Sequence, residues 1–273
     1  MHKNPGWILI MLLIAGACSK SEDGPAPEVL LPPLPPVTVT SSGTYIVNNL
    51  PGDTTQTMEG KDISDDGLFK TIYYSLEDGR TVPAEYAGTD KWDIAFAGIY
   101  NSSIWANHGE VIFENGTKGP GYGSPARGGL YLVIDPLIEG QYYNEDTKKP
   151  VLPIPIHLFE ESFEHVKEVP VENSEFLSYG YLALDHFLGS GSGYAYYDFY
   201  GSSYPGNPKK AHVVYNLPRT ILIKTAKGNY AKLILYSFYK SKPVDPDRDN
   251  IAPYLSFKYS ILKEGSKDFS KID

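Results

Sequence analysis

Cysteine is almost absent from this 273-residue chain, in which Cys18 is the only one. A lone cysteine excludes an internal disulfide and a metal site built from several thiolates. Methionine is nearly as rare, and Met58 is the only one beyond the first 17 residues. Sulfur ligands for a metal ion are therefore confined to these two positions in the rest of the chain.

Clusters of basic residues are also missing. The formal net charge is −9, and no run of lysine or arginine interrupts the acidic balance. Binding to phosphate backbones requires clustered lysine and arginine. We therefore expect no nucleic-acid partner.

An apolar run long enough to cross a membrane as a helix, about 20 residues, is absent too. The run Trp7–Ile14 has eight residues, follows Lys3 and precedes Ala15-Gly16-Ala17-Cys18. This order is typical of a secretory signal peptide, which we place at residues 1–17. The small residues before Cys18 resemble a bacterial lipobox, with Ala15 where leucine is usual. We predict that Cys18 is acylated and anchors the protein to a membrane surface; the alternative is an ordinary signal peptide followed by an incidental cysteine.

The next segment, residues 18–36, is expected to be a tether. It opens polar and acidic and then becomes rich in proline, a composition typical of extended, semi-rigid linkers. Residues 37–273 are numerous enough to bury a full hydrophobic core. We expect them to form a single domain.

Tyrosine, proline and glycine stand out, with 22, 22 and 26 copies. Tyrosine suits pleated sheets, while glycine and proline mark turns. Alternating segments predict strands at 37–47 (two short strands around a Ser-Ser-Gly turn), 68–76, 89–100, 110–113, 130–134, 179–184, 194–199 and 211–215. The prediction is an all-β fold, a β-sandwich or multi-stranded antiparallel assembly with long Gly/Pro loops.

The clearest strand signal lies at residues 219–239, which read RTILIKT, AKGN and YAKLILYSFY. Two alternating arms around a short turn that contains Gly228 predict a β-hairpin. After a polar, proline-rich loop, residues 254–261 alternate again and are expected to pair with the second arm. The C-terminal part should therefore be a β-meander.

Two central segments are harder to interpret. In the strand 89–100 we expect Trp92, Ile94 and Phe96 on one face, followed by a loop at 101–108. Residues 116–129 hold six glycines and two prolines, which predicts either a mobile loop or a loop that faces a ligand.

Proline also limits helix formation in the middle of the chain. Pro150, Pro153 and Pro155 exclude a helix over residues 151–157. At most one short helical turn is expected in residues 158–166.

No motif for catalysis is evident. The segments 121–125 (GYGSP) and 189–193 (GSGSG) lack the strand-to-helix setting of a nucleophile elbow. Asp245, Asp247 and Asp249 open like a calcium loop, but the sixth position is not glycine and the twelfth is not glutamate, which favours an acidic hairpin loop. We therefore expect a protein that is not an enzyme.

Histidine offers the remaining chemistry. No pair among the six has the spacing of a zinc motif; they are His2, His108, His157, His165, His186 and His212. The last four lie in or beside loops among many tyrosines, a setting that suits a flat aromatic ligand with an iron atom. The alternative for each is a hydrogen-bonded structural residue.

Four segments resemble the HmuY family of haem-binding lipoproteins of Bacteroidetes. They are KWDIAF (91–96), YAYYDF (194–199), the hairpin 219–239 and LSFKYSI (255–261). The lipobox and the tether fit as well, and the resemblance covers most of the chain from about residue 68 onward. It implies a hand-shaped all-β protein that captures haem at the cell surface for an outer-membrane receptor.

The resemblance also implies axial ligands for the haem iron. Family members use two histidines or two methionines from loops of the second half; the first of these loops contains His157 and His165 here. The second position follows YDF and reads Tyr200-Gly-Ser-Ser-Tyr204, without histidine or methionine. Tyr200, Tyr204 or His212 are the candidates there, and no other metal site is expected.

The function predicted from the sequence is therefore a non-catalytic, haemophore-like lipoprotein of the outer membrane or cell surface, active in iron acquisition. Its expected partners are haem or a related porphyrin, the membrane and an outer-membrane receptor. The alternative is a non-haem binding or adhesion module for glycan or protein on the same scaffold.

Overall fold

A computed structural model describes residues 31–58, 69–113, 115–169, 176, 181–186 and 191–272. The chain divides into two compact units, Met1–Leu31 and Pro32–Asp273, and the described residues belong to the second unit apart from Leu31. The predicted signal peptide, Cys18 and the tether up to residue 30 lie outside the described residues. Among those that are described, no helix is long and apolar enough to span a membrane.

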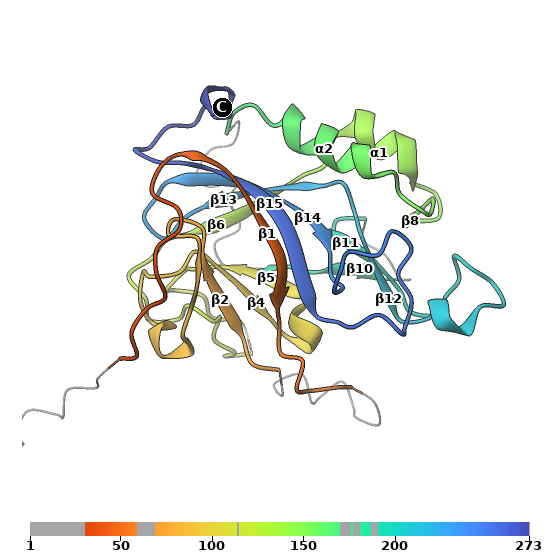
Figure 1. Ribbon diagram of the computed structural model, residues 1–273, viewed down its shortest axis with the longest axis horizontal. Coiled ribbons are helices and arrows are strands. Elements are labelled where there is room, and N and C mark those ends of the chain that lie inside the picture. Colours follow the sequence, from red (N-terminus) through yellow and green to blue (C-terminus); the bar gives the residue numbers. More distant parts are fainter. Residues whose placement is uncertain are drawn as a thin grey trace, which may run out of the picture. The chain divides into compact units, whose positions relative to one another are not determined.

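Two five-stranded antiparallel sheets dominate the second unit (Figure 1). In spatial order the first sheet contains β1 (Gly43–Pro51), β15 (Tyr254–Leu262), β14 (Tyr230–Ser237), β13 (Thr220–Lys224) and β6 (Gly129–Val133). The second sheet contains β3 (Arg80–Val82), β2 (Ile72–Ser75), β4 (Ile94–Ala97), β5 (Ser103–Ala106) and β9 (Tyr181–Leu182). The all-β class predicted from the sequence is confirmed.

Smaller elements complete the fold. A three-stranded sheet is formed by β10 (Leu184–His186), β11 (Ala195–Asp198) and β12 (Val213–Asn216), and a two-stranded one by β7 (Tyr143–Asn144) and β8 (Lys149–Pro150). The helices are α1 (Pro136–Tyr142) and α2 (Ile156–His165), with 3-10 turns at Ala84–Tyr86, Ile99–Asn101, Pro208–Lys210 and Phe269–Lys271. The pair β10–β11 is parallel, so the predicted antiparallel assembly is not uniform.

The hydrophobic core lies between the two large sheets. Ile94 and Phe96 of the second sheet join Leu233 and Phe257 of the first in one buried cluster. The rings of Tyr74 and Phe257 meet edge to face across this core, with centroids 5.6 Å apart. Alternating apolar side chains on both inner faces thus hold the sheets together.

The predicted meander is confirmed. Strand β13 pairs with β14 and β14 with β15, all antiparallel. Gly228 takes a positive φ of 83° in the connecting turn, a conformation that glycine adopts without a steric penalty. The glycine in the turn and the alternation of apolar residues in the strands therefore both predict the hairpin that the structure shows.

Several strand predictions are wrong in detail. Residues 37–42 form no strand, because the backbone amides of Thr38 and Val39 bind the Asp78 carbonyl in the turn after β2, so β1 is one strand. The loop expected at 101–108 contains β5. Trp92 precedes β4 and packs in a separate cluster with Trp105, away from Ile94 and Phe96.

The helical content also exceeds the prediction. Helix α2 has ten residues and begins directly after Pro155, so the prolines bar a helix only up to that point. Its buried side chains, Leu158, Phe159, Ser162 and Phe163, repeat with helical spacing. Helix α1 was not expected; Asp135 caps it by accepting from the Leu137 amide at 2.9 Å, and Pro136 occupies its first position.

Residues 116–128 have no regular strand, but several of them, including Gly119, Gly121 and Gly128, are buried against the rest of the fold. A Cβ atom on Gly121 would lie 2.7 Å from Asn107 Oδ1 and 3.1 Å from the Trp92 ring. Arg127 pairs with Glu110 at 2.5 Å. The glycines thus allow this segment to lie directly against the second sheet.

The last part of the predicted tether is likewise bound to the domain. The Tyr86 hydroxyl donates to the Pro32 carbonyl at 2.8 Å, and Arg80 Nη1 donates to the Pro35 carbonyl at 2.5 Å. Leu34 packs against the cluster around Trp92. Residues 32–35 are therefore part of the folded unit.

Candidate functional site

The described residues form two notable hollows. The larger, which we call the α2 groove, has a volume of about 580 Å³. It is lined by Ile46, Leu152, Pro153, Ile154, Ile156, Phe159, Glu160, Val214, Tyr215, Asn216, Tyr236, Ser237, Tyr239, Lys242, Pro243, Val244, Pro246 and Lys258. The second, between β6 and β9, has a volume of about 420 Å³. Both fall in the usual range of about 300–1,000 Å³ for small-molecule sites.

Helix α2 lies over one face of the first sheet (Figure 1), and the α2 groove is lined by Ile156 at the start of this helix and by residues of that sheet. Strands β14 and β15 supply Tyr236 and Lys258, and the segment before α2 supplies Pro153 and Ile154. Val244, in the loop after β14, is 82% exposed at its rim. An exposed apolar rim around a concave surface is a common sign of a binding site.

Helix α2 is fixed over the sheet by a buried lysine. Lys232 is 4% exposed, and its Nζ donates to the carbonyls of Phe163 and Val166 at 2.8 and 2.9 Å. These carbonyls lie at the C-terminal end of α2, where a cation is favourable. Burial lowers the pKa of Lys232 to about 8. Helix α2, which forms one wall of the groove, is therefore held in place over the sheet.

Most charged groups of the groove already have partners. Lys258 Nζ lies 2.8 Å from Glu160 Oε2, and the Tyr236 hydroxyl donates to Glu160 Oε1 at 2.5 Å. The Val214 amide donates to the Tyr239 hydroxyl at 2.9 Å. The charges that line the groove are thus largely balanced.

Two polar atoms of β12 differ from the rest. Tyr215 Oη and Asn216 Nδ2 are buried and have no hydrogen-bond partner among the described residues. Burial raises the pKa of Tyr215, and the neighbouring Tyr204 and Asp245 raise it further. The Tyr215 side chain is therefore a neutral hydroxyl that can donate a hydrogen bond rather than a phenolate.

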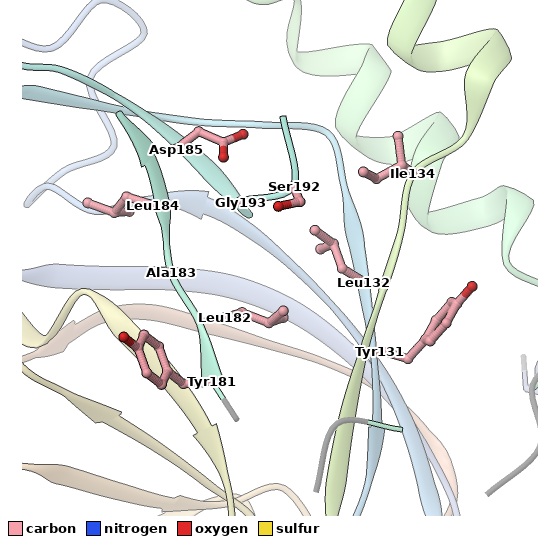
Figure 2. Close-up of a pocket in the computed structure, with 10 residues that line it drawn as sticks. All are labelled: Tyr131, Leu132, Ile134, Tyr181, Leu182, Ala183, Leu184, Asp185, Ser192 and Gly193. Atoms are coloured by element: carbon pink, nitrogen blue, oxygen red, sulfur yellow. The ribbon is translucent and has the colours of Figure 1, made fainter. Parts of the chain in front are cut away.

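The pocket between β6 and β9 is shown in Figure 2, with Tyr131 and Tyr181 on opposite sides. Its polar group Asp185 is held by Arg219 Nη1 at 3.1 Å. Arg219 is fully buried, pairs with Glu139 as well, and donates to the Gly193 carbonyl at 2.5 Å. Because Asp185 belongs to this structural network, the α2 groove is the better candidate for a ligand site.

The two histidines predicted as first ligands both lie on α2. His157 is exposed at its second position, next to Ile156 of the groove. His165 is exposed at the other end, with Nδ1 2.6 Å from Asp135 Oδ2. Neither histidine lines either hollow.

The three candidates for the second ligand lie between β11 and β12. His212 Nδ1 is 2.8 Å from the Tyr197 hydroxyl. The rings of His212 and Tyr200 both pack against Phe199, at 4.6 and 4.9 Å. Tyr204 donates to Asp245 Oδ1 at 3.2 Å and its ring lies 6.5 Å from that of Tyr215.

The structure thus brings Tyr200 and His212 together and places Tyr204 next to a residue of the α2 groove. Their predicted role as iron ligands stays a prediction. The sequence did not point to Tyr215 and Asn216, which lie in the apolar run VVYNL and look like ordinary strand residues. A polar Asn at the end of such a run was the only signal.

The described residues contain no group of three histidine, cysteine or acidic side chains that could hold a metal ion. In the acidic segment considered above, Asp245 pairs with Lys210 at 2.5 Å and Asp249 pairs with Lys209. Two of the three carboxylates are therefore engaged by lysines.

The α2 groove fits a porphyrin only in part. Its apolar walls suit the ring. Its lining contains no histidine, methionine or cysteine, and the neutral Tyr215 is a poor iron ligand. The fit is therefore to the porphyrin ring and not to the iron.

Comparisons with known proteins add little. No family model matches the chain, and no curated protein matches it. Among solved structures it is similar to a candidate lipoprotein from Bacteroides fragilis, over 80% of this chain and 88% of that chain, with 15% identity and a TM-score of 0.30. At that level the likeness assigns neither a family nor a ligand to this protein.

Proposed function

We propose that this chain is an exported, lipid-anchored binding protein of the outer membrane or cell surface, which takes haem or a related porphyrin in the α2 groove and catalyses no reaction. The observation that carries the proposal is the α2 groove itself, a mostly apolar hollow of about 580 Å³. Residues 15–18 support the anchor.

Apolar contacts account for binding in this proposal. Phe159, Ile154 and Pro243 offer apolar surface to the ring. Since no iron ligand lines the groove, binding depends on the porphyrin ring more than on the metal.

The test is a titration of residues 19–273, which keep everything after the predicted lipid-bearing cysteine, with haem and with metal-free protoporphyrin IX. We expect saturable binding of both, with similar dissociation constants, followed by the Soret band and by porphyrin fluorescence. Ile156→Glu, which places a charge on the groove wall, should weaken both.

Histidine variants separate ring binding from iron ligation. His157→Ala, His165→Ala and His212→Ala should leave binding of the metal-free porphyrin unchanged. Should haem bind far more tightly than the metal-free ring, and one of these variants abolish the difference, that histidine is an axial ligand. If neither compound saturates the protein, the porphyrin proposal is wrong and a glycan or protein ligand takes its place.

The anchor is tested independently. Cys18→Ala should move the protein from the membrane fraction to the soluble fraction of the cell envelope, because the thiol that carries the lipid is lost. An unchanged membrane fraction would contradict lipidation.

A further inference from the structure

Strand β1 forms a margin of the first sheet that lacks the protection of most sheet edges. It pairs with β15 on one side, and no described strand pairs with it on the other. Within the described residues, the backbone of residues 43–48 is hydrogen-bonded only to β15. A free edge presents a row of amides and carbonyls that can pair with another strand, and proteins commonly block such edges with charged side chains, proline or a covering segment.

The sequence of this edge contains neither charge nor proline. Residues 43–48 read GTYIVN. Thr44, Ile46 and Asn48 alternate on the exposed face, and the apolar Ile46 is 64% exposed. After Val47 the register of β1 with β15 shifts, and Asn49 takes a positive φ of 52°. A second strand can therefore follow β1 in regular pairing only as far as this bulge.

The other margins of the two large sheets are covered, charged or short. Strand β6, at the opposite end of the first sheet, faces β9 of the second sheet across the pocket in Figure 2. Strand β3 carries Arg80, which pairs with Asp78 and donates to the Pro35 carbonyl. Strand β9 has only two residues. Of the margins that the structure describes, β1 is thus the long one that is both uncharged and uncovered.

We propose that β1 pairs with β1 of a second copy of this chain, antiparallel and centred on Ile46. This register places Ile46 opposite its own copy, Thr44 opposite Asn48 and Tyr45 opposite Val47. An apolar pair, a polar pair and a pair of aromatic and β-branched side chains are all favourable across antiparallel strands, and no like charges meet. The same patch is used on both copies, so the contact closes at a dimer.

Self-complementarity is the reason to assign a second copy, rather than a strand of another protein, to this edge. A centre at Tyr45 or Val47 would place Ile46 opposite Thr44 or Asn48, an apolar side chain against a polar one. The pairing joins the first sheets of both copies into one continuous sheet, with both α2 grooves on the same side of it. The dimer does not depend on the proposed function, since either can fail while the other stands.

The first test is sedimentation of residues 19–273 over a range of protein concentrations. One pair of edge strands buries less than a standard interface of about 1,600 Å², so we expect a reversible dimer with a dissociation constant in the micromolar range. Ile46→Lys should weaken this dimer at least about tenfold, because it places two like charges opposite each other. Val151→Lys is the matched control: Val151 is 65% exposed but lies outside β1, so the dimer should persist.

Cysteine cross-linking tests the register, since residues 19–273 contain no cysteine of their own. A short bis-maleimide should link Ile46→Cys protein to itself, because directly opposite Cβ atoms lie about 4.5–5.5 Å apart. Thr44→Cys alone and Asn48→Cys alone should not link, because the equivalent positions of the two copies lie about 13 Å apart along the strands. A mixture of these two variants should link.

Hydrogen exchange assigns the dimer to this edge. Amides of residues 44–48 should exchange more slowly at high protein concentration, and Ile46→Lys should remove the difference. In dilute solution this variant should melt like the wild type, because the side chain is mostly exposed. A protein that stays monomeric at every concentration overturns the proposal and leaves the edge to a strand of another protein. A dimer that survives Ile46→Lys, or in which Thr44→Cys links to itself, overturns it as well.

Discussion

The two faces of the first sheet are both buried, but by different means. The inner face presents Ile221, Leu233, Phe257 and Ile261 to the second sheet, without a polar side chain among them. The outer face lies under α2, and its buried positions include Lys232 beside Ile234. The inner face also includes the buried Tyr259. It is held mainly by apolar packing, and the outer face by packing together with hydrogen bonds from lysine.

This difference bears on function because the α2 groove lies on the outer face. An apolar face that is fully matched by a second sheet leaves no space for a ligand. On the outer face α2 covers part of the sheet and leaves Tyr236 and Lys258 to line the groove. Close apolar packing thus lies on one face, and the groove proposed as the binding site lies on the other.

The inner face should show the largest effect of a single substitution. Phe257→Ala should lower the free energy of unfolding by about 3–5 kcal/mol, because it removes a fully buried ring and leaves a cavity. Urea unfolding of residues 19–273 measures the loss. Ser260→Ala, in the same strand but on the outer face, is the control and should cost far less. Equal losses would mean that the inner face is not the more tightly packed one.

A buried carboxylate beside the second sheet, Asp93, should make stability depend on pH. Asp93 is buried where the turn between β13 and β14 meets β2, and it accepts from the amides of Glu77 and Ala226 at 3.0 Å each. Burial raises its pKa to about 6, although these two amides act in the opposite direction. Folded protein therefore retains a proton between pH 4 and 6 that the unfolded chain, with a pKa of 3.8, has released.

Stability should consequently fall as the pH rises from about 4 to about 6, by up to about 3 kcal/mol from this group. Urea midpoints measured across this range test the prediction. Asp93→Asn should flatten the dependence, although it also weakens the fold by placing an NH₂ group against amide donors. A pH dependence that persists in the variant would assign it to other groups.

The sequence predicts the inner face well and the outer face poorly. Alternation in β13, β14 and β15 places Leu233 and Phe257 on a common side, and this suffices to predict the meander. The alternation in β14 would look the same if Lys232 were exposed to water instead of lying under a helix. Only the tertiary structure shows that a helix covers it, because α2 contributes contacts that local sequence does not encode.

The lining of the α2 groove could not be predicted from the sequence either. The resemblance directed attention to His157, His165 and the residues after Phe199, while the groove draws its lining from β1, β12, β14, β15, α2 and two loops. Such a set is separated by up to about two hundred positions in the chain and has no spacing to detect. Unpartnered atoms such as Asn216 Nδ2 can be recognised only once the neighbours are placed.

On the outer face the largest effect should come from Lys232. Lys232→Met keeps most of the apolar stem but leaves the carbonyls of Phe163 and Val166 without their donor. We expect a loss of about 2 kcal/mol, together with faster hydrogen exchange in α2. Unchanged exchange in α2 would show that the helix is held by Phe159 and Phe163 alone.

Lys258→Met is the matched substitution and should have the smallest effect. Lys258 also lies over the Phe163 ring, at 4.5 Å compared with 4.3 Å for Lys232, but its partners are the carboxylates of Glu160 and Glu164 near the surface. Ion pairs of this kind contribute about 0–1 kcal/mol and weaken in salt. The loss in urea unfolding should therefore stay below about 1 kcal/mol and vanish at high ionic strength, whereas that of Lys232→Met should persist. If the two variants lost the same free energy at every salt concentration, the buried lysine would act on α2 through its charge and not through its hydrogen bonds.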